Sequence, residues 1–166
     1  SHGHSRIAFL SGEEEHLSTP ERRAGFKEAL KAHGITVDDS LVLPGAYSFD
    51  SGFERTAKLM ERTDRPTAIF GCNDEIGAGV LAAAKSVGKA VPEELAVAGF
   101  ENSPFSQQAQ PPMTTAAQAI KDVAKLASLN SHKNTPGKLR KWPKHGFVCS
   151  RNYNLFIRFY ATRLHI

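Results

Sequence analysis

The sequence is poor in the residues that support disulfides, zinc sites and membrane spans. Its only cysteines, Cys72 and Cys149, lie far apart, so neither a disulfide framework nor a zinc site has a basis. No apolar run approaches the roughly 18 to 20 residues that cross a bilayer, and the first residues lack the apolar segment of a signal peptide. A processed chain would also lack a signal peptide, so that absence leaves the compartment open. The few cysteines make a reducing cytoplasm the simpler expectation, and the lack of long apolar runs predicts no contact with a membrane.

Acidic residues are absent from one end of the chain. Residues 128–166 contain 8 Lys and Arg and no Asp or Glu, whereas residues 1–127 contain 13 Lys and Arg and all 17 Asp and Glu. Apart from an apolar patch at 155–157, residues 130–166 show neither helical nor alternating periodicity. We interpret them as an atypical basic tail, for which a shifted reading frame is one explanation. The pI of 9.2 belongs to this tail and indicates no nucleic-acid-binding face on the main domain.

The first hundred residues alternate short apolar runs with helical patterns. The runs fall at 7–10, 41–43, 68–70 and 95–100, and the helical patterns lie at about 20–32, 51–60 and 74–87. Continuous apolar strands separated by helices are typical of parallel strands covered on both faces. The sequence therefore predicts an α/β fold with a doubly wound parallel sheet.

Local signals set the predicted helix ends. Ser18 or Thr19 is a candidate N-cap, because Pro20 follows in the first turn, and Gly34 and Gly88 are predicted stops. Beyond Pro104 the alternation fails. Residues 110–115 suggest an irregular crossing, and 120–129 a short helix with Val123, Ala124 and Ala127 facing inward.

Polar residues follow the predicted strands, where ligands bind in open parallel sheets. Arg22, Tyr47, Asn73 and Glu101 would offer a guanidinium, an aromatic ring, an amide and a carboxylate along one rim. This set suits a neutral polyhydroxylated ligand. Each also has a structural alternative: Arg22 as a solvated helix charge, Tyr47 as a half-buried packing residue, Asn73 or Asp74 as a helix cap, and Glu101 as an exposed loop acid.

Other patterns point away from catalysis and cofactors. Gly77–Ala82 matches the dinucleotide pattern G-x-G-x-x-A, but Gly77 lies inside the predicted helix and not in the turn that binds phosphate. Its small residues instead favour close packing or a subunit interface. Glu13, Glu14 and Glu15 are consecutive and cannot all face one point, and His16 has no catalytic partners in the pattern. We expect no metal site, no cofactor and no enzymatic activity.

Five landmarks together resemble the inducer-binding core of the lac-repressor/galactose-repressor family of bacterial transcription regulators. They are residues 3–12 (GHSRIAFLSG), 21–26 (ERRAGF), 66–74 (PTAIFGCND), 91–100 (VPEELAVAGF) and 111–115 (PPMTT). The resemblance implies one lobe of a periplasmic-binding-protein-like fold that clamps a small effector, often a sugar, between two lobes. Effector binding then changes operator affinity through coupling between the two sites.

The resemblance also assigns roles to residues. Arg22 and Asn73 would hydrogen-bond effector hydroxyls, Tyr47 would stack on the ring, and Gln118 would sit at the rear of the cleft. Glu101 stands where the family usually has Asp. The implied homodimer surface includes Gly77, Val80, Leu81, Ala84 and Phe105.

The same resemblance divides the chain. Residues 1–112 would form the C-terminal lobe of the effector-binding domain, and 113–129 a crossover and helix of the lobe that is missing. Nothing in the sequence resembles a helix-turn-helix headpiece, so operator DNA would be bound only through a headpiece outside this chain. The competing function is a sugar-binding protein of a transport system, which shares the fold. An enzyme on a doubly wound sheet is less favoured, because no nucleophile or phosphate loop follows the strands.

Overall fold

The computed structural model describes residues 3–119, 121 and 124 of the chain. Most of the helix predicted over 120–129, and all of the tail 130–166, lie outside the described residues. None of the described helices is long and apolar enough to span a bilayer. The elements run in the order β1 (Ile7–Leu10), α1 (Ser18–Ala32), a 3-10 helix (Asp39–Leu41), β2 (Val42–Leu43), α2 (Phe49–Met60), β3 (Ala68–Gly71), α3 (Asp74–Ser86), β4 (Ala96–Glu101), α4 (Pro104–Gln108) and β5 (Thr114–Ala117).

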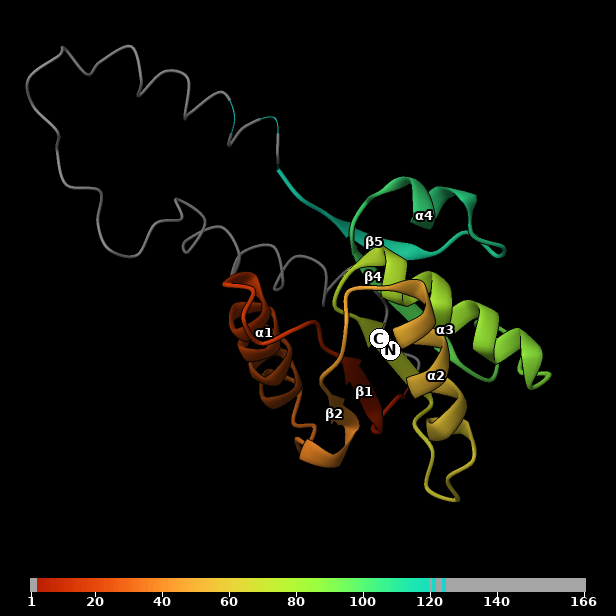
Figure 1. Ribbon diagram of the computed structural model, residues 1–166. Helices are drawn as coiled ribbons and strands as arrows, with labels where there is room; N and C mark the ends of the chain where they lie inside the picture. Colours follow the sequence, from red (N-terminus) through yellow and green to blue (C-terminus); the bar gives the residue numbers. More distant parts are fainter. Residues whose placement is uncertain (1–2, 120, 122–123, 125–166) are drawn as a thin grey trace, which may run out of the picture.

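The strands form one parallel sheet in the order β2-β1-β3-β4-β5. Phe9 is paired with Val42 on one side and with Phe70 on the other. Helix α1 covers one face of the sheet, while α2 and α3 lie side by side on the other (Figure 1). The predicted α/β doubly wound parallel sheet is therefore confirmed. The direction of strand order changes at β1, so the chain leaves β1 and β3 toward opposite faces.

A fifth strand lies where the sequence pattern indicated an irregular crossing. Thr114 and Thr115 begin β5 and pair with Ala98 and Gly99 of β4. The interpretation of 110–115 as wholly irregular is thus wrong for its last two residues. The reason is that the sequence of β5 is Thr-Thr-Ala-Ala, which lacks the continuous apolar run that identified the other strands.

The predicted helix ends are confirmed at the C-termini but not at the first N-terminus. Gly34 and Gly88 directly follow the caps of α1 and α3 with φ of 70° and 71°, a conformation that favours glycine. The predicted capping by Ser18 or Thr19 is wrong. Ser18 is already the first helical residue, and no side chain caps this end. The hydroxyl of Thr19 instead hydrogen-bonds Tyr47.

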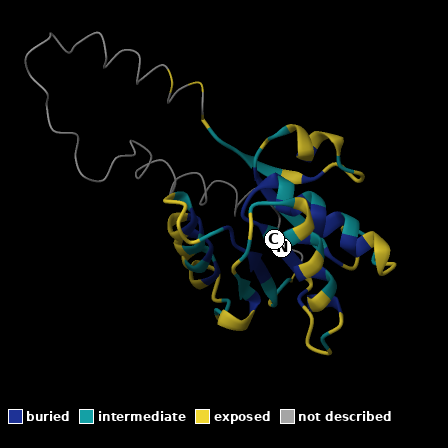
Figure 2. Ribbon diagram, in the orientation of Figure 1, coloured by how far each residue is buried: buried dark blue, intermediate teal, exposed yellow. Residues whose placement is uncertain are grey.

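The core lies on both faces of the central strands, as the buried residues of Figure 2 show. Phe9 stacks on Phe26 of α1, with 5.0 Å between ring centroids. On the other face α2 and α3 approach so closely that their backbones touch. A Cβ at Gly79 would collide with the carbonyl oxygen of Phe49, and one at Gly52 with that of Ile76. The small-residue stripe of α3 therefore serves packing inside the chain.

Four of the five residues of the predicted dimer surface are largely buried within this chain. Val80 and Ala84 are fully buried within the chain, and Leu81 is 7% exposed. Gly77 is buried against the Met113 side chain. Contact of these four residues with a second subunit stays a prediction. Phe105, on α4, is 44% exposed and stays a candidate for such contact.

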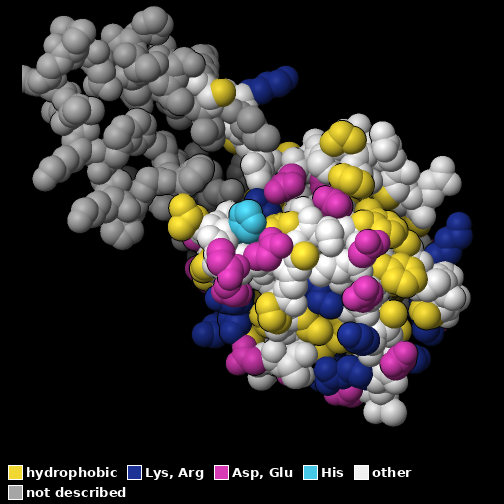
Figure 3. Space-filling view, in the orientation of Figure 1, with side chains coloured by type: hydrophobic (Ala, Val, Ile, Leu, Met, Phe, Trp, Pro, Cys, Tyr) yellow, Lys and Arg dark blue, Asp and Glu magenta, His cyan; other side chains and the backbone are white. Residues whose placement is uncertain are grey.

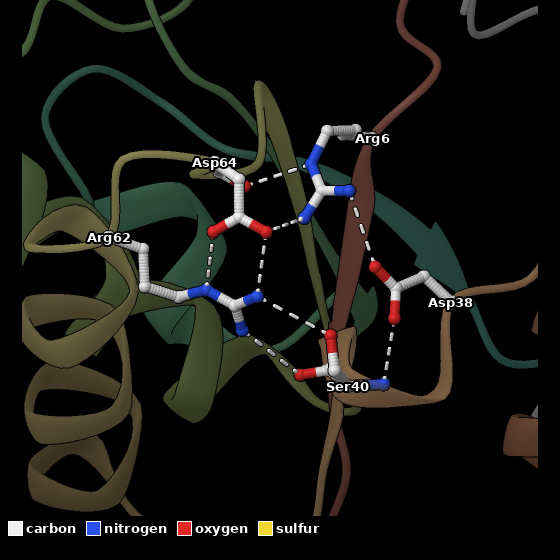
Figure 4. Close-up of polar contacts among 5 residues, drawn as sticks. All are labelled: Arg6, Asp38, Ser40, Arg62 and Asp64. Atoms are coloured by element: carbon white, nitrogen blue, oxygen red, sulfur yellow. Dashed lines mark hydrogen bonds and ion pairs between the residues drawn. The ribbon is translucent and has the colours of Figure 1, made fainter.

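A network of charged residues ties together three segments at the amino end of the sheet (Figure 4). Arg6, which precedes β1, donates to Asp38 and to the side chain and carbonyl of Asp64. Arg62 also donates to Asp64. An open cavity of about 420 Å³ adjoins this network, on the opposite edge of the sheet from the predicted site.

The network should make stability depend on pH in the acid range. A hydrogen bond from Ser40 lowers the pKa of Asp38, and one from Arg62 lowers that of Asp64, below the ordinary value of 3.8. A depressed folded-state pKa adds stability that is complete above pH 3.8 and is lost as the pH falls below it. We expect the difference in urea midpoint between the wild type and a D38N/D64N variant to be present at neutral pH and to vanish in strong acid. A difference that persists in acid would contradict this account.

Candidate functional site

The predicted site residues come from different parts of the chain to the carboxyl edge of the sheet. Arg22 lies in the second turn of α1, Tyr47 follows β2, Asn73 follows β3, and Glu101 ends β4. The chain leaves β1 and β3 toward opposite faces, which opens a crevice at this edge. The site therefore occupies the topological switch point, where open α/β sheets bind ligands.

Arg22 is the centre of the site. Its Nη1 donates to the carbonyl oxygen of Cys72 at 2.6 Å, and its Nη2 donates to Oε1 of Glu101 at 3.1 Å. The guanidinium lies 4.5 Å from the centroid of the Phe100 ring. Arg22 is only 8% exposed, which excludes the alternative of a solvated helix charge. Its Nε is buried with no hydrogen-bond partner among the described residues.

The positive charge of Arg22 is retained in this site. Burial alone would lower the pKa of Arg22, but its interactions with Cys72 and Glu101 outweigh burial and leave the pKa raised. Glu101 adopts a φ of 112° and Asn102 a φ of 56°, in the region that favours glycine. Non-glycine residues in such conformations cluster at functional sites, because the surrounding structure must hold them there. The strain is therefore consistent with a site that fixes the Glu101 carboxylate against Arg22.

Tyr47 lies across the end of β1. A Cβ at Gly12 would overlap its ring, so the absence of a side chain at Gly12 admits the ring. Its Oη lies 2.7 Å from Oγ1 of Thr19 and 3.3 Å from Sγ of Cys72. Burial, followed by the hydrogen bond with Cys72, raises the pKa of Tyr47, which keeps the phenol neutral. The His16 ring stands edge-on to the tyrosine ring at 5.2 Å between centroids.

Asn73 and Asp74 have different structural roles at the start of α3. Asn73 is the N-cap, because its Oδ1 accepts from the amide of Ile76 at 2.9 Å. Asp74 is fully buried and accepts from the amide of Ser103 at 2.6 Å and from the hydroxyl of Thr115. The capping alternative thus applies to Asn73, and the Nδ2 group of its amide is not used by the cap. Asp74 holds α3, the loop after β4 and strand β5 together.

Gln118 is the predicted site residue with the weakest connection to the others. It is half-buried and directly follows β5, whose Ala117 pairs with Glu101. This register places Gln118 at the same edge of the sheet as the rest of the site. The contacts described above bring together Arg22, Tyr47 and Glu101, with Asn73 next to Cys72 in the chain.

Four residues of the site were not predicted from the sequence. Thr19 and Cys72 hydrogen-bond Tyr47, Phe100 lies under Arg22, and the buried Arg55 reaches the ends of β1 and β2. The burial of Arg55 could have been predicted from its spacing in the sequence. The spacing places Arg55 on the inner face, because the buried residues of α2 recur at three and four: Gly52, Arg55, Thr56, Leu59 and Met60.

The four loops at the carboxyl edge carry acidic charge. Residues 11–17, 44–48, 72–75 and 101–103 contain six Asp and Glu and no Lys or Arg. Figure 3 shows acidic side chains gathered on this side of the molecule. Within residues 3–119 and at 121 and 124, no three His, Cys, Asp or Glu side chains form a group that could hold a metal ion. The arrangement offers hydrogen bonding and ring stacking to a ligand.

The architecture agrees with a family comparison. Residues 1–136 match the model of the periplasmic binding protein-like domain. The chain belongs to this family. The matched range of the periplasmic binding protein-like domain contains the whole described fold and also residues 130–136 of the basic tail.

Curated relatives of this domain are transcriptional regulators. Catabolite control protein A of Priestia megaterium is 39% identical over 126 residues, which cover 75% of this chain and 38% of that protein. The regulator CelR of Thermobifida fusca is 36% identical over 116 residues, which cover 70% of this chain and 34% of that protein. The repressor CytR of Escherichia coli K12 is 35% identical over 127 residues, 76% of this chain and 37% of that protein. The chain thus spans less than half the length of these relatives.

Solved structures with a similar fold are also transcriptional regulators. A complex of the transcriptional regulator CelR with cellobiose has a TM-score of 0.71 at 33% identity and covers 80% of this chain and 42% of its own. The lac repressor dimer bound to operator and the anti-inducer ONPF has a TM-score of 0.68 at 27% identity, covering 80% of this chain and 48% of its own. The predicted resemblance to the lac-repressor/galactose-repressor family is therefore confirmed, as is the periplasmic-binding-protein-like fold.

Proposed function

We propose that this chain forms an effector-sensing lobe of a lac-repressor-type transcriptional regulator. The observation that supports the proposal is the position of Arg22 at the topological switch point of the sheet. Arg22 joins α1, the end of β3 and the end of β4 through hydrogen bonds to Cys72 and Glu101. A ligand that engages Arg22 therefore acts on three elements at once, as coupling between an effector site and a distant site requires.

The proposed effector is a neutral carbohydrate or a related polyhydroxylated molecule. Arg22, Asn73 and Gln118 supply donors or acceptors, Glu101 supplies acceptors, and Tyr47 supplies a flat ring. Because Glu101 already balances the charge of Arg22, and the surrounding loops are acidic, a neutral ligand is favoured over an anionic one. No step in this function calls for a catalytic group, so the proposed role is binding without turnover.

The proposal includes partners and a compartment. Operator DNA would be bound through a helix-turn-helix headpiece outside this chain, in the cytoplasm. A homodimer would form on the side of α2 and α4, where Phe49 is 38% and Phe105 44% exposed. Hydrophobic side chains gather over α3 and α4 in Figure 3, which supports this placement. Solute capture for a transporter is not favoured, because the curated relatives named above are regulators.

The expected affinity of an effector for one lobe determines how sensitive the binding assay must be. Three net hydrogen bonds at about 1 kcal/mol each, the middle of the usual range, and ring stacking at about 1 kcal/mol give about 4 kcal/mol. That free energy corresponds to a Kd of about 1 mM. The assay must therefore detect weak binding.

Ligand-detected NMR meets this requirement and tests the proposal. We expect saturation transfer from the chain to at least one member of a panel of neutral mono- and disaccharides and nucleosides, with weaker transfer to the corresponding sugar phosphates. The saturation-transfer amplification should approach a plateau as the concentration of that sugar is raised, as binding to one site requires. Transfer to the phosphates alone would contradict the neutral effector, and transfer to no member of the panel would contradict a carbohydrate or nucleoside effector.

A further inference from the structure

Arg55 of α2 is a buried cation that is held only by backbone oxygens. It is 9% exposed, and none of the ion pairs among the described residues includes it. Its Nη1 donates to the carbonyls of Ser11 and Leu43 at 2.7 and 2.8 Å. Its Nε donates to the carbonyl of Ser51 at 2.9 Å, and its Nη2 reaches that of Ala46 at 3.5 Å.

Holding a full charge in this place is unfavourable. Burial lowers the pKa of Arg55 to about 10, which still leaves the side chain protonated at neutral pH. A neutral side chain of similar size would avoid this cost of desolvation. The backbone oxygens that accept hydrogen bonds from Arg55 belong to the segments around Tyr47. Arg55 therefore stabilises the position of these segments.

The geometry around Arg55 connects it to the Tyr47 platform. Leu43 ends β2 and also accepts from the amide of Ser11, so Nη1 joins the ends of β1 and β2 where they are already paired. Ala46 directly precedes Tyr47. A Cβ at Gly45 would lie 2.9 Å from Cζ of Arg55, so the loop wraps tightly around the guanidinium.

We propose that Arg55 is a positioning residue of the effector site, which fixes residues 44–47 against the end of β1 and thereby sets the place of the Tyr47 ring. The part of this inference that concerns effector recognition rests on the proposed function. Its structural content, that Arg55 keeps the Tyr47 loop closed, can be tested without an effector.

Cys72 supplies the reporter for that test. Its side chain is fully buried, and the Tyr47 hydroxyl lies 3.3 Å from its Sγ. Loosening the Tyr47 loop should expose this thiol to a reagent such as DTNB. A Cys149→Ser background makes Cys72 the only thiol in the chain. In this background we expect Arg55→Met to raise the rate of Cys72 modification at least tenfold, and Arg55→Lys to restore part of the protection.

The control separates loop opening from general loss of stability. Leu59 lies on the same helix, is 2% exposed and belongs to the core, so Leu59→Ala destabilises the fold without touching the loop carbonyls. The rates are compared after measuring the unfolding free energy of each variant in urea. If Arg55→Met reacts no faster than Leu59→Ala at equal stability, the proposal is wrong. Should Arg55→Met fail to fold, Arg55→Lys and Gly45→Ala decide in its place, both with raised Cys72 reactivity expected.

A second readout links Arg55 to recognition. Using the sugar that gives the largest response in the NMR panel, we expect Arg55→Lys to weaken its binding relative to Leu59→Ala. Equal binding in the two variants would overturn the role in recognition. A panel without any binder would contradict the proposed effector, whereas unchanged Cys72 protection in the Arg55 variants would overturn the positioning role and leave the proposed function standing.

Discussion

Replacing Gly79 by alanine is expected to lower the free energy of unfolding by about 2 to 3 kcal/mol, although alanine is the better helix former. A Cβ at Gly79 would collide with the carbonyl oxygen of Phe49 and lie 2.7 Å from the amide nitrogen of Phe53. Both atoms are backbone, so no side-chain rotation relieves the contact. The helices α2 and α3 would have to move apart, and the core residues between them and the sheet would lose packing.

Urea denaturation followed by circular dichroism measures this effect. Ala82→Gly on the same helix is the matched control, because Ala82 is half-buried and the change carries mainly the helix-propensity difference of about 0.5 to 1 kcal/mol. If α2 and α3 were not in close contact, Gly79→Ala would stabilise the protein by a similar amount. An unchanged or increased stability would therefore contradict the observed packing.

Arg22→Ala is expected to lower effector affinity at least tenfold while the fold is retained. The change removes the donors to Cys72 and Glu101, so the loops after β3 and β4 are no longer joined through α1. It also leaves the Glu101 carboxylate, whose side chain is 33% exposed, without its ion-pair partner. A tenfold loss corresponds to about 1.4 kcal/mol, which is the value of one charge-assisted hydrogen bond.

The neighbouring arginine provides the control for this prediction. Arg23 is partly exposed and pairs with Glu14 on the surface, so Arg23→Ala should leave both stability and effector affinity nearly unchanged. Affinity is measured by NMR titration with the responding sugar, and retention of the fold by circular dichroism and urea denaturation. If Arg22→Ala binds the sugar with the affinity of the wild type, the assignment of Arg22 to the effector site is wrong.

The sequence predicted β1, β2, β3 and β4, which carry apolar runs, and missed β5, which does not. Continuous apolar runs marked β1, β3 and β4, because such runs occur where helices cover both sides of a strand. The edge strand β5 has the sequence Thr-Thr-Ala-Ala, so the same signal was absent. The small residues on α3 permit close approach, but their pattern does not say whether the approaching helix belongs to the same chain; here α2 is a helix that approaches them.

The site was predicted in its location but not in its contacts. A general rule places ligands beyond the carboxyl ends of parallel strands, and this rule selected Arg22, Tyr47, Asn73 and Glu101. The ion pair of Arg22 with Glu101 joins residues far apart in the chain, and no local pattern encodes such a pair. Arg55 was overlooked because an arginine on an amphipathic helix is usually exposed, and only its spacing relative to Gly52, Thr56 and Leu59 indicated otherwise.

The central claim is that a small neutral effector binds at the carboxyl edge of this sheet, around Arg22. It is tested most directly by recording the backbone amide resonances of the isotope-labelled chain during titration with the responding sugar. The account predicts that the shifted resonances cluster in residues 11–19, 45–48, 72–74 and 101–103, together with Gln118. Shifts confined to the opposite edge, around Arg6 and Asp38, or no shifts with sugar at about 50 mM, well above the expected Kd, would contradict it.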